Sequence, residues 1–392
     1  MSTAKTLESV LLLSVRNFRH QAANGSLYEF EDLITGLCDS ILCSPENEKS
    51  GSRKRYRSAR YLGFGHSLAD SLASMGHLNE LEVDHDLIML VLDNPWQMHL
   101  LNQVRGWREH PAKKICYISE CWPGQLSQWR LMKEPFSNFD HIFLGTASSV
   151  PVLANLIDIP CSYLPCGVNT STFSDMRKVA GRLIDVSYIG RREQALHGEL
   201  KRFTETEGLF YLFDSARAQR LEVDDPVEHR RMYASMLKRT QISMALPAKS
   251  NAVDVTGGFE EIATRFFEFM AAGVIVVGRP PDSDAFRQLF DWQDAVISVG
   301  HNYSSSPSVI RELLNDHEKA RDISKRNIIN SLKKNDWVYR FIDVVEAIGF
   351  QPNRRMRARV EELAQQIHLL EADLIGSSGS QNGTPTSKSM AR

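Results

Sequence analysis

The sequence predicts an α/β protein with two doubly wound domains that face each other across a cleft, followed by a C-terminal helical extension. The chain has 392 residues, which is too long for one ordinary core and suits two domains of roughly 150–200 residues each. Short apolar runs alternate with amphipathic stretches, and this rhythm stops once and then restarts. Such alternation is typical of parallel sheets that are covered by helices.

The first domain is expected over residues 1–168 and contains six apolar runs that predict strands. These runs are 9–15, 40–44, 86–92, 114–119, 141–145 and 161–165. Several are apolar without alternation, as in parallel strands buried on both faces. Amphipathic stretches at 65–75, 95–105 and 147–156 lie between them and predict helices.

The second domain is expected over residues 169–350. Residues 166–183 carry turn-forming residues without a strong period, so we place the interdomain linker there. The expected strands are 184–190, 209–214, 241–247, 274–278 and 295–300, and the expected helices are 193–206, 226–239, 260–272, 283–290, 306–334 and 336–349. Two Rossmann-like domains in tandem leave a cleft between the carboxyl ends of their strands, where ligands bind.

A heptad pattern marks the C-terminal extension over residues 354–375. Its apolar residues are spaced 4, 3, 4, 3 and 4 apart: Met356, Val360, Leu363, Ile367, Leu370 and Leu374. Two interpretations remain open, namely self-association into a homo-oligomer and packing against the chain's own domains. Residues 376–392 are rich in Ser, Gly, Thr and Gln and predict a disordered tail.

Composition excludes several classes of protein. The formal net charge is −2, which gives no sign of a nucleic-acid partner. No run approaches the roughly 18–20 apolar residues of a membrane span, and Glu8 precedes a short apolar stretch that does not fit a secretory signal. The cysteines lack zinc-knuckle spacing and are expected to be buried, reduced thiols: Cys38, Cys43, Cys116, Cys121, Cys161 and Cys166. We therefore expect a cytoplasmic protein.

Residues 257–278, "GGFEEIATRFFEFMAAGVIVVG", place Glu268 inside an apolar helical run. In a helix from Glu260 to Ala272, Glu260 and Glu268 would lie about 12 Å apart with only about 80° of rotation between them. Carboxylates at this spacing can accept hydrogen bonds from the hydroxyls at the two ends of a nucleotide-sugar. The alternative is that Glu268 forms a salt bridge with Arg265.

Two glycines, Gly257 and Gly258, precede this predicted helix. Glycine lets the backbone N–H groups at a helix start approach an anion closely. We therefore expect the start of the helix to meet the phosphates of such a ligand.

Three segments together carry a resemblance to a known family. "EEIATRFFEFMAAGVIVVG" resembles the donor-binding segment of retaining GT-B glycosyltransferases, a Glu-x(7)-Glu helix followed by a small-residue turn and an apolar strand. "YLPCGVNTSTF" (163–173) is similar to the joint that ends the first domain in this family. "IDVSYIGRR" (184–192) is similar to the first strand and phosphate-side loop of its second domain. The whole pattern most resembles the CgeB-like (spore-maturation-type) branch.

The resemblance implies roles for individual residues. Glu268 would bind the nucleotide ribose, and Glu260 would face the transferred sugar. The loop before Glu260 departs from the family pattern, so Glu261 stays an alternative for the sugar-facing acid. The donor diphosphate would be bound at the loop after the first strand of the second domain, at Gly190 and at Arg191 or Arg192. Arg265 and Lys249 are other possible phosphate ligands.

Acceptor groups are expected on loops after strands of the first domain. The loop 16–26 carries His20, and Glu120 stands at the carboxyl end of a strand. Glu120 either contacts an acceptor hydroxyl or acts as a base, or it is only an acid at a helix start. A basic segment, 48–60, predicts a mobile loop that is either solvated or in contact with an anionic acceptor or the inner membrane surface.

These features predict a glycosyltransferase that moves a sugar from a nucleoside diphosphate to an acceptor hydroxyl. A retaining enzyme needs no dedicated base, because the leaving diphosphate can take the acceptor proton; an inverting one needs Glu120 or His20. We expect no metal or other cofactor, since no Asp-x-Asp pair stands in a suitable place. The acceptor would be a glycan, a lipid-linked molecule or a small molecule. The alternatives are a non-catalytic nucleotide-sugar-binding scaffold protein and a nucleotide-sugar epimerase of the same fold.

Overall fold

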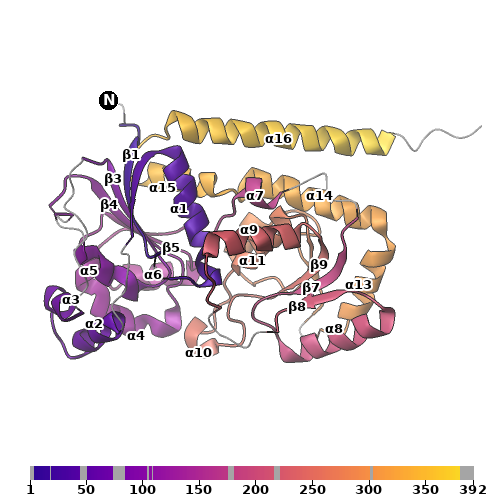
Figure 1. Cartoon of the computed structure of the whole chain (residues 1–392), viewed down its shortest axis with the longest axis horizontal. Coiled ribbons are helices and arrows are strands. Elements are labelled where there is room, and N and C mark those ends of the chain that lie inside the picture. Colours follow the sequence, from indigo (N-terminus) through magenta and orange to yellow (C-terminus); the bar gives the residue numbers. More distant parts are fainter. Residues whose placement is uncertain are drawn as a thin grey trace, which may run out of the picture.

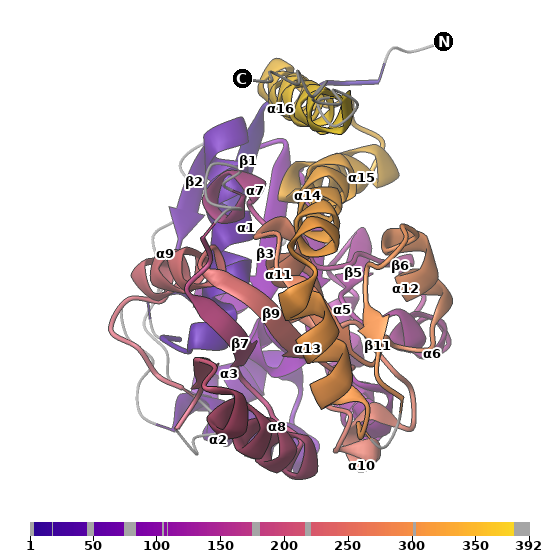
Figure 2. The ribbon, with the colours of Figure 1, turned by 90° about the vertical axis from the view of Figure 1, so that its right-hand side faces the viewer.

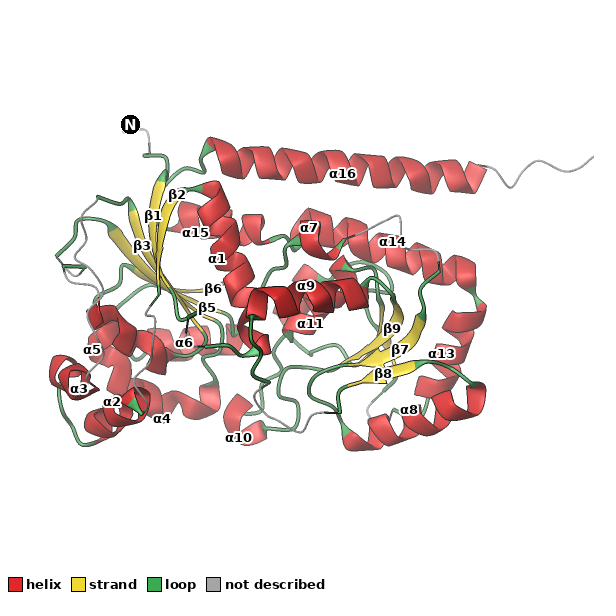
Figure 3. Ribbon diagram, viewed as in Figure 1, coloured by secondary structure: helices red, strands yellow, loops and turns green. Residues whose placement is uncertain are grey.

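The computed structural model contains two α/β domains, each built on a parallel sheet (Figure 1). It describes residues 4–379 except 18, 45–50, 74–83, 104–105, 108, 175–180, 216–220 and 301–302. The first sheet has the strand order β2-β1-β3-β4-β5-β6, and the second has the order β11-β10-β9-β7-β8. This confirms the predicted fold class, and Figure 3 shows the helices packed around both sheets.

Each predicted strand is present within a few residues of its expected bounds. The strands of the first sheet are β1 (Ser9–Leu13), β2 (Asp39–Cys43), β3 (Leu87–Leu92), β4 (Lys113–Ile118), β5 (His141–Leu144) and β6 (Cys161–Tyr163). Those of the second are β7 (Ile184–Tyr188), β8 (Tyr211–Phe213), β9 (Thr240–Ala245), β10 (Ile275–Gly278) and β11 (Ile297–Ser298). All of their pairings are parallel.

The strand order reverses between β1 and β3 in the first sheet and between β7 and β9 in the second. Ligands of doubly wound folds bind outside the carboxyl ends of the strands at such switch points. The two switch points therefore mark the two places where functional side chains are expected.

The helices cover both sheets and line the domain boundary. Those up to the linker are α1 (Gly25–Leu37), α2 (Ser52–Tyr61), α3 (His66–Ala73), α4 (Leu126–Trp129), α5 (Lys133–Phe136), α6 (Val150–Ala154) and α7 (Thr170–Phe173). Those after it are α8 (Gln194–Glu207), α9 (Pro226–Leu237), α10 (Val253–Thr256), α11 (Thr264–Ala271), α12 (Asp284–Leu289), α13 (Ser306–Asn315), α14 (His317–Lys334), α15 (Trp337–Ala347) and α16 (Arg354–Gly379). Helix α1 of the first domain packs against α9 of the second (Figure 1).

Three helical predictions need correction. The basic segment 48–60 is not a mobile loop where it is described: α2 spans Ser52–Tyr61, because Tyr56 and Ala59 supply a buried face. The expected helix 306–334 is two helices that divide at Asp316, whose carboxylate accepts the Lys319 N–H as the N-cap of α14. The expected helix 95–105 is a 3-10 helix, η2 (Pro95–Gln103).

The C-terminal end of the second domain returns to the first, which corrects the predicted boundary at residue 350. Trp337 of α15 stacks on Phe30 of α1 with ring centroids 4.4 Å apart. Phe341 and Val344 of α15 are fully buried in the same core as the first sheet. Periodicity showed that this helix has an apolar face but not which sheet that face covers.

Helix α16 lies across the two domains (Figures 1 and 2). Met356 and Leu363, two apolar residues of the heptad pattern, are fully buried, and the helix packs against α14 and α15. Of the two interpretations of the heptad pattern, the structure therefore shows packing within the chain. Residues 376–379 are helical where a disordered tail was predicted; the rest of that tail and the Leu374 side chain lie outside the described residues.

All six cysteines are free thiols; three are buried and three are half-buried. Among the described residues, no helix is both long and apolar enough to cross a membrane.

The packing of α16 against the rest of the chain can be tested with two leucines of this helix. Leu363→Ala removes a fully buried side chain and should lower the free energy of unfolding by about 2–5 kcal/mol. Leu369 is 70% exposed, so Leu369→Ala should change stability by less than about 0.5 kcal/mol. Urea unfolding measures both. Equal losses for the two variants would show that α16 does not pack on the chain in this way.

Candidate active site

The carboxyl end of β7 brings together two arginines that were predicted to bind phosphate. Gly190 has a positive φ of 82°, which glycine adopts without strain. The Arg265 guanidinium lies against it, since a Cβ there would lie 2.8 Å from Nη2 of Arg265. Nη1 of Arg265 donates to the Arg191 carbonyl at 3.3 Å, and Nη1 of Arg191 donates to Asn251 Oδ1 at 3.1 Å. Helix α11 and the loop after β7 thus place two guanidinium groups at the switch point of the second sheet.

The other two predicted phosphate ligands lie differently. The Arg192 guanidinium lies 5.4 Å from the centre of the Phe213 ring, and its buried Nη1 has no partner in the described part of the chain. Lys249 reaches across the domain boundary and forms a salt bridge with Glu120 of the first domain. Its Nζ also lies 4.3 Å from the centre of the Trp122 ring.

The predicted helix 260–272 begins later than expected, so the two-turn carboxylate spacing is wrong. Helix α11 starts at Thr264, and the Glu261 carbonyl accepts a hydrogen bond of 2.9 Å from the Ala248 N–H. Glu260 and Glu261 therefore lie in an extended segment beside the loop after β9. The Glu260 carboxylate pairs with Arg279 and accepts the Asp282 N–H at 2.9 Å.

The Glu261 side chain contacts the first domain, whereas the Glu260 side chain contacts only the second among the described residues. One carboxylate oxygen of Glu261 accepts the Ser148 N–H at 2.8 Å, and the other accepts the Ala147 N–H at 3.1 Å. These N–H groups begin the 3-10 helix η5 (Ala147–Ser149), where a carboxylate is favourable. Both carboxylates have partners within the chain, but Glu261 is only 4% exposed whereas the Glu260 side chain is 28% exposed. Glu260 is therefore the better candidate for the sugar-facing acid.

The predicted role of the two glycines at a helix start is wrong. Gly257 ends α10 in a left-handed conformation, and Gly258 follows it. A Cβ on Gly257 would lie 3.4 Å from the backbone nitrogen of Gly124 in the first domain. A Cβ on Gly124 would lie only 2.1 Å from the Asp254 carbonyl. Close packing of the two domains, rather than an anion, therefore explains glycine at 124, and positions 257 and 258 lie away from the start of α11.

Glu268 lies on α11 and is 7% exposed. Its carboxylate pairs with Arg230 of α9, not with Arg265 as the alternative interpretation held. Arg230 also binds Glu29 of α1 in the first domain, at 2.8 Å from Nε and 3.2 Å from Nη2. One buried arginine therefore joins a carboxylate of each domain.

The charges of this Glu29–Arg230–Glu268 network depend on one another. Burial raises the pKa of Glu29, and the charge of Arg230 lowers that pKa in part. Burial by itself would lower the pKa of Arg230, but the two carboxylates outweigh it and the net shift is upward. Glu29 also accepts the Asn169 N–H at 2.6 Å and the indole N–H of Trp337 at 3.2 Å. These bonds offset part of the cost of burying a carboxylate.

On the side of the first domain, the structure adds Asp93, which the sequence analysis missed. Asp93 follows β3 at the switch point of the first sheet, and its carbonyl accepts the Glu120 N–H at 2.9 Å. Burial, with the nearby charge of Glu120, raises the pKa of Asp93. An acidic residue directly after the apolar run 86–92 was the available signal.

Glu120 and His20, the predicted bases, have different surroundings. Glu120 accepts the Trp122 indole N–H at 3.2 Å in addition to its salt bridge with Lys249. His20 is exposed; its Nε2 lies 3.1 Å from the Asn17 carbonyl, and its own carbonyl accepts the Val223 N–H. Glu120 thus lies beside a basic residue of the second domain, whereas His20 contacts that domain through its backbone.

Residues 191–346 match a family model described as "Glycosyl transferase-like". A search of curated protein sequences finds no significant match. Two solved structures illustrate the fold. An α-glucosyltransferase in complex with UDP-glucose and DNA is 12% identical, with a TM-score of 0.55 and coverage of 87% of this chain and 99% of that one. Anabaena HepE in complex with UDP-glucose is 10% identical, with a TM-score of 0.50 and the same coverage.

These matches define the class of protein. The whole chain has the GT-B fold, with two Rossmann-like domains, and its second domain is a glycosyltransferase-like domain. The family match covers residues 191–346 and so places a glycosyltransferase-like domain in the second half of the chain.

The expectation that nucleic acid is excluded as a partner needs correction. A structure of this same fold contains DNA. A net charge of −2 is therefore no ground for excluding nucleic acid, because local surfaces decide such contacts.

The buried network predicts that removing Arg230 lowers the free energy of unfolding by an amount that depends on pH. Arg230→Met leaves Glu29 and Glu268 without a counter-charge, which should lower the free energy of unfolding by about 3–5 kcal/mol at pH 8. Without Arg230, burial raises the folded-state pKa of Glu29 further above its unfolded value. Stability from such a group is present below the unfolded pKa and is lost as pH rises through the folded pKa. The loss should therefore be smaller at pH 5 than at pH 8.

Arg231 provides the matched control, because it is the next residue of α9 and is exposed. Arg231→Met should change stability by less than about 0.5 kcal/mol. Urea unfolding at both pH values measures the two variants. A loss for Arg230→Met that is the same at pH 5 and pH 8 would contradict a network held together by charge.

Proposed function

We propose that this chain transfers a sugar from a nucleoside diphosphate sugar to an acceptor hydroxyl, in the cleft between its two domains. The main support is one observation: Arg265 lies against Gly190 and donates to the Arg191 carbonyl, at the switch point of the second sheet. Asp93 and Glu120 stand at the carboxyl ends of strands of the first sheet, and Glu120 meets Lys249 of the second domain. The UDP-glucose complexes of proteins with the same fold support a nucleotide-sugar as donor.

The donor would lie with its diphosphate against Arg191 and Arg265. Guanidinium groups pair with two phosphate oxygens at once. Arg192 and Lys249 are the further cations near this end of the sheet. In this proposal Glu260 faces the sugar and Glu268 binds the ribose, which requires Arg230 to share the Glu268 carboxylate with the ligand.

We propose a retaining, metal-independent reaction. The bond between the anomeric carbon and the diphosphate oxygen breaks, the anomeric carbon bonds to the acceptor oxygen, and the diphosphate takes the acceptor proton. Arg191 and Arg265 would stabilise the negative charge that develops on the diphosphate. In the inverting alternative, Asp93 or Glu120 takes the proton as a base; the raised pKa of Asp93 favours it for that role.

The assignment to the CgeB-like branch is also a proposal. It is supported by the segments "DVSYIG" (185–190) and "RFFE" (265–268). The structure adds a physical reason for their pairing, because Gly190 of the first segment accommodates the side chain of Arg265 in the second.

We further propose that the acceptor is lipid-linked and that α2 and α3 lie on an anionic membrane surface at the cytoplasmic face. Five large apolar side chains are exposed over residues 61–72: Tyr61 (52%), Leu62 (76%), Phe64 (40%), Leu68 (51%) and Leu72 (47%). Lys54 and Arg57 of the adjoining α2 are exposed as well. Apolar and basic side chains in this combination are typical of helices that lie in the interface of anionic bilayers.

The donor site is tested by removing Arg265. Wild-type protein is first screened by thermal shift against nucleoside diphosphates and their sugars. A binder at about 100 times its dissociation constant should add about 2.7 kcal/mol of stability. With the best donor, Arg265→Ala should lower kcat/KM for nucleotide release by about 10- to 100-fold, since one charged hydrogen bond contributes about 1.5–3 kcal/mol. Arg287→Ala is the control, because Arg287 pairs only with surface carboxylates among the described residues.

The same assays separate the alternatives. Binding without nucleotide release would support a non-catalytic scaffold, and a changed sugar on the recovered nucleotide would support an epimerase. Stabilisation by none of these ligands would contradict the proposed donor class. Glu268→Ala tests the ribose contact: it should remove the preference of the wild type for a ribose over a 2′,3′-dideoxyribose donor.

Membrane contact predicts binding that depends on lipid charge. The protein should float with vesicles of phosphatidylglycerol and not with vesicles of phosphatidylcholine. The double variant Leu62→Ser/Leu68→Ser should lose flotation, because each leucine adds buried apolar area in the interface. Leu369→Ser changes an exposed leucine of α16, outside the proposed membrane surface, and should leave flotation unchanged. Flotation that is equal for both variants would refute this surface.

A further inference from the structure

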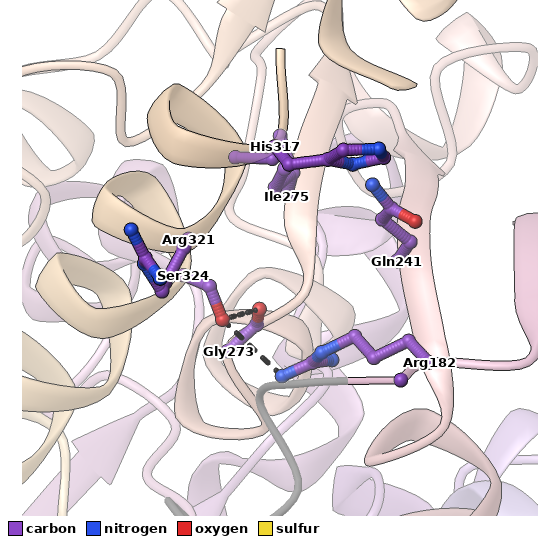
Figure 4. Close-up of a pocket in the computed structure, with 9 residues that line it drawn as sticks. Arg182, Gln241, Gly273, Ile275, His317, Arg321 and Ser324 are labelled. Carbon is purple, nitrogen blue, oxygen red and sulfur yellow. Dashed lines mark hydrogen bonds between the residues drawn. The ribbon is translucent and has the colours of Figure 1, made fainter. Parts of the chain in front are cut away.

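A pocket lies at the amino-terminal ends of strands of the second sheet (Figure 4), whereas the candidate active site lies at their carboxyl ends. It has a volume of about 260 Å³ and lies between the amino-terminal ends of β9 and β10 and the first two turns of α14. It is lined by Gly181, Arg182, Gln241, Gly273, Ile275, His317, Ala320, Arg321 and Ser324. Pockets for drug-sized ligands are usually about 300–1,000 Å³, so this one suits a small ligand.

The polar side chains of the pocket are rich in hydrogen-bond donors. Arg182, His317 and Arg321 are basic, Gln241 carries an amide, and no lining residue is a carboxylate. Ser324 is already engaged: its hydroxyl donates to the Gly273 carbonyl at 2.6 Å. A ligand that satisfies this set must offer several acceptor oxygens and a negative charge.

Arg182 is half-buried, and its hydrogen-bond partners among the described residues are all neutral. Its Nη2 donates to the Ala272 carbonyl at 2.8 Å and to Ser324 Oγ at 3.2 Å, and its Nη1 donates to the Thr240 carbonyl. Its Nε is buried and has no hydrogen-bond partner in the described part of the chain. Burial lowers the pKa of Arg182 to about 10. Arg182 forms no salt bridge with the described residues, and a bound anion would supply the counter-charge that its partly desolvated guanidinium lacks.

The remaining donors are free to reach a ligand. Arg321 and His317 are exposed on α14, and Gln241 is half-buried at the start of β9. None of these three side chains makes a hydrogen bond or ion pair within residues 4–379 as far as the structure describes them. Figure 4 shows His317 and Gln241 on one side of the pocket and Arg182 with Ser324 on the other.

We propose that this pocket binds a small oxyanion that carries a phosphate group, either inorganic phosphate or the phosphoryl group of a small metabolite. Arg182 supplies positive charge, since both of its Nη groups already donate within the chain. The exposed guanidinium of Arg321 supplies charge and paired donors, which match the geometry of phosphate oxygens. Gln241 and His317 supply further donors from the facing wall. The site is separate in space from the proposed donor site, which lies at the carboxyl ends of the same strands.

Helix α11 connects the pocket with the proposed donor site. Arg182 holds the Ala272 carbonyl at the C-terminal end of α11, and the other end of that helix carries Arg265. A ligand at Arg182 would therefore contact the far end of the helix that borders the candidate active site.

The test is calorimetric titration of the full chain with inorganic phosphate and, separately, with glycerol phosphate. Wild-type protein should bind at least one of them saturably. Arg321→Ala should weaken that binding about 10-fold, the effect of one lost charged hydrogen bond of about 1.4 kcal/mol. Arg321 is exposed and makes no hydrogen bond or salt bridge among the described residues, so its variant should keep the wild-type melting temperature without ligand.

Two controls separate this pocket from other anion sites. Arg311→Ala changes an exposed arginine of α13 that pairs with Glu207 outside the pocket, and it should leave binding unchanged. Arg265→Ala, at the proposed donor site, should leave it unchanged as well. Tighter binding of glycerol phosphate would identify a metabolite's phosphoryl group, and equal affinity would identify phosphate itself. No saturable binding, or binding that Arg321→Ala does not weaken, would overturn the proposal.

Discussion

The arrangement of the two domains depends on one buried arginine. Arg230 holds Glu29 of the first domain and Glu268 of the second at the same time. Each of the three side chains is less than a tenth exposed, so the network is favourable only while both domains are in contact and water is excluded. The network therefore holds the carboxyl ends of the two sheets opposite each other, and the candidate active site lies where they meet.

Several neighbouring contacts have the same consequence. Glu261 caps η5 of the first domain, Lys249 pairs with Glu120, and Gly124 admits the backbone of α10. Acidic residues near the cleft are thus divided between two roles. Glu29 and Glu261 join the domains, whereas Asp93 stands at the end of β3 and Glu260 pairs with Arg279 just after β10, where a ligand is expected. Glu268 takes part in the network and is also the proposed ribose ligand, so donor binding and domain contact share one carboxylate.

Most of the fold was predictable from the sequence, and less of the site was. The strands were found because runs such as 86–92 and 274–278 are apolar throughout, a local property. Arg191 and Arg265 were both named as phosphate ligands from a family pattern, and only the structure shows that they lie near each other. The start of α11 was missed, since the segment with Glu260 and Glu261 pairs its backbone with Ala248 instead of continuing the helix. The basic segment was taken for a loop because its buried face is short.

The sequence by itself determined the two sheets, the helices between them, and the residue types available to each strand end. Only the tertiary structure decided which charges meet. Glu268 pairs with Arg230 and not with Arg265, and Arg230 pairs with Glu29, some 200 positions away in the chain. It also decided that α15 and α16 pack against the first domain rather than extend the second or join another chain. Periodicity reports that a side chain faces a core, but pairing and packing depend on distances between segments that no local pattern contains.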